Sequence, residues 1–301
     1  MNEKPQSRLF RRYIQSTGIP ADARHVHYAL VAIDEQETVM DKISSVRNPL
    51  CLHMRKLGGS REYRYKNNEF LCDGIKLLKE AVQSGAEVKA VLTASDISFP
   101  LPVETHVYRC NRSVIGSVSP LKVAPGPLFT CVMPARTITD AAEGTHILLD
   151  GLQDPGNVGT IIRTADAFAV NGVILTNGCA DIYNPKAIRA SMGAIFRQNI
   201  YFIDLAGLMG LKGKGFRLIG AVPGAGKRDI SGVQLHNTIV AIGNEGNGLS
   251  KDILSICDEE ATIPISQDCE SLNAAVAAAI VMWETARQQV VVATGGCNGN
   301  S

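Results

Sequence analysis

The sequence has little excess charge and no long apolar run. Its 301 residues carry a formal net charge of +1, so bulk charge does not indicate a nucleic-acid partner, and only a local basic cluster could. No apolar stretch reaches the roughly 18 residues that a membrane span needs. The arginines near the first residue are not followed by the apolar segment of a secretory signal. We therefore expect a cytoplasmic protein that is not bound to a membrane.

The eight cysteines form no C-x-x-C pair. This pattern favours reduced thiols, most of them buried, as is usual for a cytosolic protein. His25 and His27 have the spacing of half a metal site, but no second pair of ligands with suitable spacing accompanies them. We therefore expect no bound metal.

Hydrophobic residues make up 45% of the chain, which together with its length favours two domains. We expect an N-terminal extension of unknown role over residues 1–40 and a disordered tail over 291–301. Between them we expect a small α/β domain over 41–136 and a larger α/β domain over 144–290. The small domain opens with a helix over 48–57, with Asn48 as N-cap and Pro49 in the first turn.

The larger domain alternates strands with helices. Its strands are nearly continuously apolar, which is typical of a parallel sheet covered on both faces. We expect these strands at 146–152, 172–177, 216–222, 238–243 and 261–265, and helices at 157–169, 185–197, 249–257 and 272–289.

The stretch GAVPGAGKRD, residues 220–229, has the appearance of a phosphate-binding loop. The pattern G-x-x-x-x-G-K-[ST] requires a glycine where Ala221 stands and a hydroxyl where Arg228 stands. The following residues look like a loop or turn, and not like a helix whose N-terminus could receive a phosphate. The G-x-G-x-x-G fingerprint of dinucleotide-binding proteins is also missing. We therefore predict a turn at the end of a buried strand, with a nucleotide-triphosphate site as the weaker alternative.

Three other segments carry polar residues next to predicted strands: DPGNVGTIIRTADAF (154–168), AIGNEGNGLS (241–250) and IPISQDCESLNAAVAAAI (263–280). Asn157 and Ser271 are candidate N-caps for the helices that follow them. Glu245 lies in a glycine-rich loop after a buried strand, and such loops at the carboxyl ends of parallel strands bind ligands in open α/β sheets.

Two features of these segments have alternative interpretations. Arg163 is either a surface residue that pairs with Asp166 at i+3, or an arginine placed to bind a phosphate bidentately. The helix after Ser271 is apolar on all sides, which predicts burial in the core and, in addition, a subunit interface.

The three segments resemble, in order and spacing, the motifs of the SpoU (TrmH-type) RNA 2'-O-ribose methyltransferases of the SPOUT class. The resemblance covers about residues 145–290. Residues 48–81 resemble the substrate-binding domain of this family, which is similar to ribosomal RNA-binding proteins, although Asp73 stands where a glutamate is usual. The resemblance implies a parallel α/β fold with a C-terminal deep trefoil knot, S-adenosylmethionine as cofactor, and a homodimer with the active site completed across the interface.

The resemblance also implies roles for individual residues. The positions that match the catalytic ones of the family are Asn157, Arg163, Glu245, Ser271 and Asn273. The positions that match its cofactor-binding backbone are Gly243, Asn244, Ile263 and Leu272. The family proposal makes the arginine the base, but an arginine side chain hardly loses its proton in proteins. Arg163 as a ligand of the neighbouring phosphate that also stabilises the developing alkoxide is the other interpretation.

A basic cluster in the small domain predicts RNA binding. Tyr63 and Tyr65 are interleaved with it and could stack on bases, and Glu62 is the one acid between residues 47 and 66. Its members are Arg47, Arg55, Lys56, Arg61, Arg64 and Lys66. An additional RNA-binding domain favours ribosomal RNA over transfer RNA as substrate. A transfer-RNA methyltransferase and a non-catalytic RNA-binding or ribosome-assembly factor are the alternatives.

Overall fold

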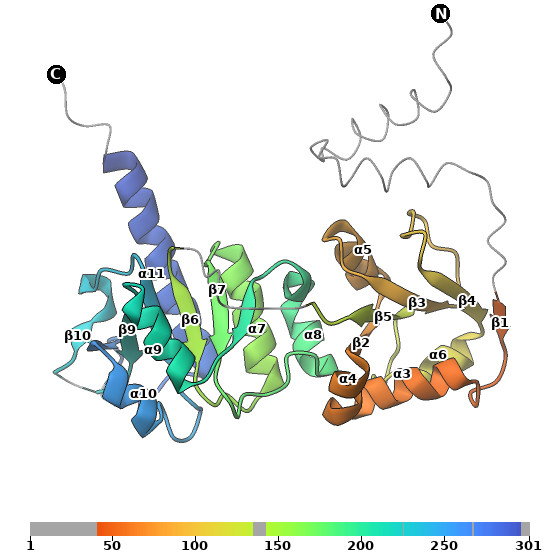
Figure 1. The fold of residues 1–301 in the computed structure, drawn as a ribbon, viewed down its shortest axis with the longest axis horizontal. Coiled ribbons are helices and arrows are strands. Elements are labelled where there is room, and N and C mark those ends of the chain that lie inside the picture. Colours follow the sequence, from red (N-terminus) through yellow and green to blue (C-terminus); the bar gives the residue numbers. More distant parts are fainter. Residues whose placement is uncertain (1–40, 135–142, 225, 267, 296–301) are drawn as a thin grey trace, which may run out of the picture. The chain divides into compact units, whose positions relative to one another are not determined.

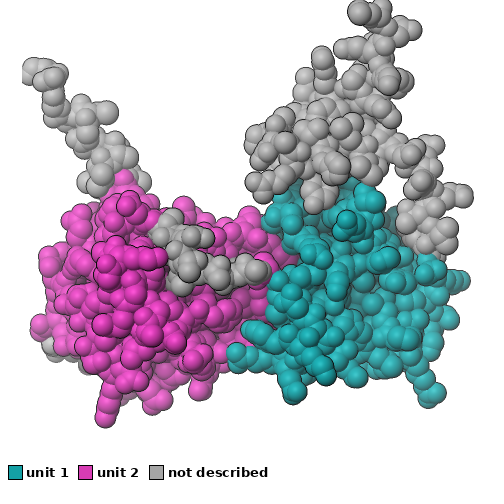
Figure 2. All heavy atoms as spheres, viewed as in Figure 1, with its two compact units in different colours: residues 1–133 teal, residues 134–301 magenta. Residues whose placement is uncertain are grey.

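The structure, a computed structural model, describes residues 41–134, 143–224, 226–266 and 268–295. The chain divides into two compact units, residues 1–133 and 134–301 (Figure 2). The predicted extension over residues 1–40, the His25–His27 pair and the last six residues lie outside the described residues.

The first unit contains a five-stranded mixed sheet (Figure 1). Its strand order is β1 (Asp41–Ile43), β4 (His106–Cys110), β3 (Val88–Thr93), β5 (Leu128–Val132), β2 (Glu69–Asp73). Strand β5 is antiparallel to β2 and β3, whereas β1, β3 and β4 are parallel. The helices among its described residues are α3 (Pro49–Gly59), α4 (Arg61–Asn67), α5 (Ile75–Gln83) and α6 (Arg112–Val118).

The start of α3 is as predicted, because the side chain of Asn48 accepts a hydrogen bond from Leu50 N and Pro49 is the first helical residue. Helix α4 was not predicted. It begins after Ser60, whose hydroxyl accepts from Tyr63 N. The two helices carry all members of the basic cluster except Arg47, which precedes α3.

The second unit contains a seven-stranded sheet in which every pair of neighbouring strands is parallel (Figure 1). The order is β10 (Arg228–Asp229), β12 (Glu259–Thr262), β9 (Arg217–Ala221), β11 (Thr238–Ile242), β6 (His146–Leu149), β7 (Gly172–Leu175), β8 (Ile200–Phe202). The five predicted strands are present, and the short strands β8 and β10 were missed.

Helices cover both faces of this sheet. Leu148, Ile174 and Leu218 share a core with α9 (Leu205–Gly213) and α10 (Lys251–Ile256). Because side chains alternate along a strand, the fully buried Ile147 and Val173 point to the other face. The remaining helices of the unit are α7 (Pro155–Ala167), α8 (Pro185–Ser191) and α11 (Ala274–Gly295), and α7 packs against both α8 and α11. The prediction from the continuously apolar strands, that both faces of the sheet are covered, is therefore confirmed.

Helix α11 differs from its prediction in two respects. It continues to Gly295, so the predicted tail is wrong for residues 291–295. It is also not buried on all sides, because the side chains of Val276 and Trp283 are 47% and 57% exposed. These residues lie on one apolar stripe of the helix, seven positions apart.

The sheet order places the last strand, β12, between the consecutive strands β9 and β10. The chain therefore returns into a space that two earlier strands already border. The C-terminal helix is attached nearby, since Gln288 donates to Val233 O at 2.9 Å and accepts from Leu235 N at 3.0 Å. The trefoil knot itself stays a prediction.

The glycine-rich stretch 220–229 does not lead into an α-helix. Strand β9 ends at Ala221, and the stretch ends in β10, which pairs with β12. The predicted turn is therefore wrong at Arg228 and Asp229, while a 3-10 helix over Ile230–Gly232 follows. Lys227 pairs with Glu260, and Arg228 pairs with Glu259 at 3.2 Å. The phosphate-loop alternative lacks its helix N-terminus, and its lysine is already bound to a carboxylate.

Candidate active site

The first turn of α7 is capped by Asp154, and not by Asn157 as predicted. The Asp154 carboxylate accepts from Gly156 N and from Asn157 N, and Pro155 occupies the first helical position. The prediction was wrong because the helix begins two residues earlier than the pattern suggested. Asn157 consequently lies inside the first turn with its side chain available for other contacts.

The loop after β11 folds back on itself at Gly243. Asn244 and Gly248 exchange two backbone hydrogen bonds of 2.9 Å each, and Asn244 Nδ2 donates to Gly151 O at 2.8 Å. A Cβ atom at Gly243 would lie 2.2 Å from the carbonyl carbon of Gly248. Only glycine fits there, and the resulting hairpin directs Glu245 towards the start of α7.

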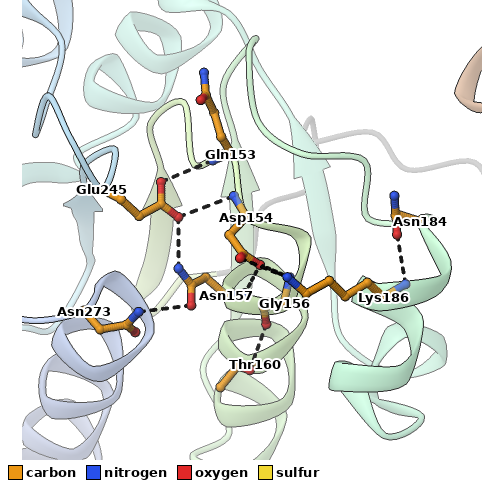
Figure 3. A network of polar contacts seen from close by, with 9 residues as sticks. All are labelled: Gln153, Asp154, Gly156, Asn157, Thr160, Asn184, Lys186, Glu245 and Asn273. Carbon is orange, nitrogen blue, oxygen red and sulfur yellow. Dashed lines mark hydrogen bonds and ion pairs between the residues drawn. The ribbon is translucent and has the colours of Figure 1, made fainter.

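Glu245, Asn157 and Asn273 form a continuous chain of side-chain hydrogen bonds (Figure 3). Asn157 Nδ2 donates to Glu245 Oε1 at 2.9 Å, and Asn273 Nδ2 donates to Asn157 Oδ1 at 3.2 Å. The carboxylate of Glu245 also accepts from Gln153 N at 3.3 Å and, more weakly, from Asp154 N at 3.4 Å. One residue from each of the three sequence segments thus meets at one point.

The start of α11 differs from its prediction. Asn273 Oδ1 accepts from Ala275 N at 2.9 Å and from Val276 N at 3.3 Å, so Asn273 and not Ser271 caps the helix. The helix begins three residues after Ser271, which is too far for a cap. Ser271 is exposed, and its carbonyl accepts from Cys269 Sγ at 3.3 Å.

Arg163 is exposed on α7. Its alternative pairing with Asp166 is wrong, because Asp166 binds Arg197 at 2.8 Å. Across the ranges that the structure describes, the Arg163 guanidinium has no hydrogen-bond or ion-pair partner. The structure therefore joins three of the five predicted catalytic residues directly and leaves Arg163 and the Ser271 hydroxyl accessible.

Hydrogen bonds keep the two carboxylates of the site charged. Burial alone would raise the pKa of Glu245, but the amide of Asn157 and neighbouring backbone N–H groups outweigh it and lower this pKa below its ordinary value. Lys186 is the main cause of the lowered pKa of Asp154, and its Nζ lies 2.9 and 3.0 Å from the two carboxylate oxygens. The role of Asp154 as cap and its contact with Lys186 were missed in the sequence, where only the position of Asp154 before Pro155 could have indicated the cap.

The four predicted cofactor positions lie on loops that follow the carboxyl ends of β11 and β12. Gly243 and Asn244 follow β11, Ile263 follows β12, and Leu272 precedes α11. Strand β9 lies between β11 and β12, and all three strands are parallel. Their carboxyl ends therefore share one edge, which is where ligands bind in open α/β sheets. All four residues are half-buried, which suits a ligand bound by backbone groups and apolar side chains.

The basic cluster of the first unit is exposed at every position except Arg64. That residue is 3% exposed, and its guanidinium donates to Leu57 O at 2.6 Å, so its assignment to an RNA-binding surface is wrong. Lys56 Nζ lies 5.4 Å from the centroid of the Tyr63 ring, and Arg61 Cζ lies 5.5 Å from that of Tyr65. These distances are in the range of cation–π contacts.

The described residues contain no cluster of three or more metal-binding side chains. No helix in the same ranges is long and apolar enough to cross a membrane. The seven cysteines among them are free thiols, and Cys269 is the exposed member of this group.

The fold and the polar site define an α/β protein with a candidate ligand site at the carboxyl ends of parallel strands. Residues 144–283 match the model of the SpoU rRNA Methylase family. The 23S rRNA (guanosine(2553)-2'-O)-methyltransferase RlmP of Bacillus subtilis is 32% identical over 249 residues, which cover 81% of this chain and 98% of that protein. The chain therefore belongs to the SpoU rRNA methylase family, as the three segments indicated.

Further similar proteins come from Streptomyces viridochromogenes. Its 23S rRNA (uridine(2479)-2'-O)-methyltransferase is 28% identical over 263 residues, which cover 81% of this chain and 91% of that protein. The crystal structure of its SpoU methyltransferase AviRb with the cofactor AdoMet matches with a TM-score of 0.74 and 28% identity, covering 81% of this chain and 99% of that one. The likeness spans both units and confirms the parallel α/β fold.

Proposed function

We propose that this protein transfers a methyl group from S-adenosylmethionine to a ribose 2'-hydroxyl of 23S-type ribosomal RNA. The observation that carries the proposal is the chain of hydrogen bonds from Glu245 through Asn157 to Asn273, in which Asn157 lies on the same helix, α7, as the accessible Arg163. The activities named for the relatives from Bacillus subtilis and Streptomyces viridochromogenes support the choice of 23S rRNA.

The residues at the sheet edge would hold the cofactor. Gly243, Asn244, Ile263 and Leu272 offer backbone groups and half-buried apolar atoms, and the AdoMet complex of AviRb supports a cofactor of this kind. When bound, S-adenosylmethionine supplies a methyl group that its positive sulfur already activates. The protein then has to align the hydroxyl with that group and to stabilise the oxygen as it loses its proton.

We assign these tasks to the side chains on the three segments. Arg163 binds the phosphate next to the target ribose and stabilises the developing alkoxide, since a guanidinium remains protonated. Asn157 and Glu245 hold the start of α7 in place through their hydrogen bond. Ser271 and Asn273 hydrogen-bond the ribose, and the accessible hydroxyl of Ser271 suits this task.

Two further assignments belong to the same proposal. The exposed cations Arg47, Arg55, Lys56, Arg61 and Lys66 bind RNA phosphates, with Tyr65 beside Arg61 available for stacking. The protein forms a homodimer through the apolar stripe of α11 that includes Val276 and Trp283, because large exposed apolar side chains on one helix face favour a partner surface.

Methyl transfer to fractionated RNA tests the proposal. The purified protein is incubated with methyl-labelled S-adenosylmethionine and separately with 23S rRNA, 16S rRNA and transfer RNA that lack the modification. We expect label in 23S rRNA, at a ribose. Label in transfer RNA would make it a transfer-RNA enzyme, and no label in any fraction would favour a non-catalytic RNA-binding factor.

A further inference from the structure

The side chain of Lys186 contacts Asp154, the residue that caps α7. Its Nζ is 2.9 Å from Oδ1 and 3.0 Å from Oδ2 of Asp154, and the same carboxylate accepts the N–H groups of Gly156 and Asn157 (Figure 3). The backbone N–H of Asp154 points to Glu245 at 3.4 Å. Asp154 is therefore the point at which Lys186, the first turn of α7 and the Glu245 loop are connected.

The backbone of Lys186 is held in place by the start of α8 and by the packing of α8 against α7. Asn184 Oδ1 accepts from Lys186 N at 2.9 Å and starts α8. Helices α7 and α8 approach closely at Gly159, where a Cβ atom would lie 2.3 Å from Ala187 O. A Cβ atom at Gly156 would lie 3.0 Å from Cε of Lys186. Gly159 therefore lets α7 and α8 approach each other, and Gly156 leaves the space through which the Lys186 side chain reaches Asp154.

The pair is poorly suited to a role in stability. The side chains of Lys186 and Asp154 are 61% and 44% exposed, and exposed ion pairs contribute little to the free energy of unfolding. Its electrostatic effect on the site is more direct. Asp154 and Glu245 place two carboxylates at the start of α7, and like charges repel. Lys186 neutralises the one that caps α7.

We propose that Lys186 is a positioning residue for methyl transfer: by holding and neutralising the Asp154 carboxylate it fixes the first turn of α7, and with it Asn157 and Arg163. The inference rests on the proposed function. The competing explanation is that Lys186 binds an RNA phosphate directly. The two can be distinguished, because a positioning residue changes kcat, whereas a phosphate ligand changes KM for RNA and its salt dependence.

The test compares Lys186→Met, Lys186→Arg, Asp154→Asn and the double variant of Lys186→Met with Asp154→Asn. We expect Lys186→Met to lower kcat about tenfold and to change KM for 23S rRNA less than about twofold. Lys186→Arg retains most of the activity, since arginine can bind the same carboxylate. We expect Asp154→Asn to lower kcat as much as Lys186→Met does. The double variant should be no worse than either single variant, because both changes break the same ion pair.

A second readout requires no activity. Hydrogen exchange of the amides of residues 156–158 accelerates in Lys186→Met and not in the matched control Lys214→Met, at an unchanged Tm. Normal exchange there, or a raised KM with a smaller salt dependence at unchanged kcat, would overturn the inference. A wild-type protein that transfers no methyl group would refute the proposed function instead, and the exchange measurement would still decide whether Lys186 orders the start of α7.

Discussion

The side-chain amide of Asn157 donates a hydrogen bond of 2.9 Å to the carboxylate of Glu245, although 88 positions separate the two residues. The same asparagine accepts from Asn273, 116 positions away. Asn157 therefore has both its donor and its acceptor bound to other segments, and the start of α7 cannot shift without breaking one of these bonds.

Glu245→Gln should lower kcat about tenfold and leave the Tm nearly unchanged, because the exposed carboxylate orders the site and adds little to stability. Glutamine presents one acceptor oxygen where Glu245 uses two, and its amide group would face N–H donors. Steady-state kinetics with 23S rRNA measures the effect. The exposed Glu143 in the same unit supplies the control, Glu143→Gln, which should behave as the wild type.

Gly243→Ala should weaken the binding of S-adenosylmethionine more than about tenfold, because the new Cβ atom would force apart a hairpin that has no room for it. Calorimetric titration gives the Kd. Gly246→Ala is the matched control in the same loop, where the nearest atom to a Cβ is Asn244 Oδ1 at 3.6 Å, an ordinary contact. Equal affinities of the two variants would remove Gly243 from the cofactor site.

The buried His146 should make the stability of the protein depend on pH. It is fully buried beside Phe216, and its ring nitrogens have no hydrogen-bond partner among the described residues. Burial lowers the pKa of His146 below 6.5, although the backbone of Gly144 opposes the shift. The unfolded chain therefore binds this proton at a higher pH than the folded one. Stability is at its full value above about pH 6.5 and falls as pH is lowered towards the folded pKa, by at most about 1.4 kcal/mol per pH unit.

Urea unfolding of the wild type and of His146→Leu at pH 7.5 and pH 5.5 measures this contribution. We expect a smaller loss of stability on acidification in the variant. The difference between the two proteins isolates His146 from the other groups that titrate in this range. A variant that loses as much stability as the wild type would show that His146 is not the group responsible.

Arg61→Gln should weaken RNA binding and reduce the slope of log K against log salt by about 0.7–0.9, the value expected for one phosphate contact. Its stacking on Tyr65 would be lost as well. Arg64→Gln provides the contrast: this buried residue supports the end of α3, so its loss should lower the Tm while the salt slope stays the same. A changed slope in Arg64→Gln would contradict the surface as we define it.

The sequence predicted the parallel sheet well because its buried strands are apolar without interruption. It missed α9, whose glycines at 207, 210 and 213 resemble a loop, although Leu208 and Leu211 pack into the core and stabilise the helix. It also assigned Arg64 to the surface, because the side that a helix presents to the core cannot be read from charge alone. The resemblance named the candidate catalytic residues, but the contacts among them join separate segments of the chain and required the structure.

The same limit applies to the helix starts. Asn157 and Ser271 are suitable cap residues by type, yet Asp154 and Asn273 cap the helices because each lies nearer to the first free N–H groups. Because Asp154 caps α7, the side chain of Asn157 can bind Glu245. Asn273 both caps α11 and donates a hydrogen bond to Asn157.

Mapping of 2'-O-methyl groups in 23S rRNA after incubation with the wild type and with Arg163→Ala tests the central claim most directly. We predict that the wild type and S-adenosylmethionine produce one new ribose methylation. We expect Arg163→Ala to produce none, although it binds the cofactor with unchanged affinity and keeps its oligomeric state. Methylation of a base in place of a ribose, or retained transfer by Arg163→Ala, would contradict the account.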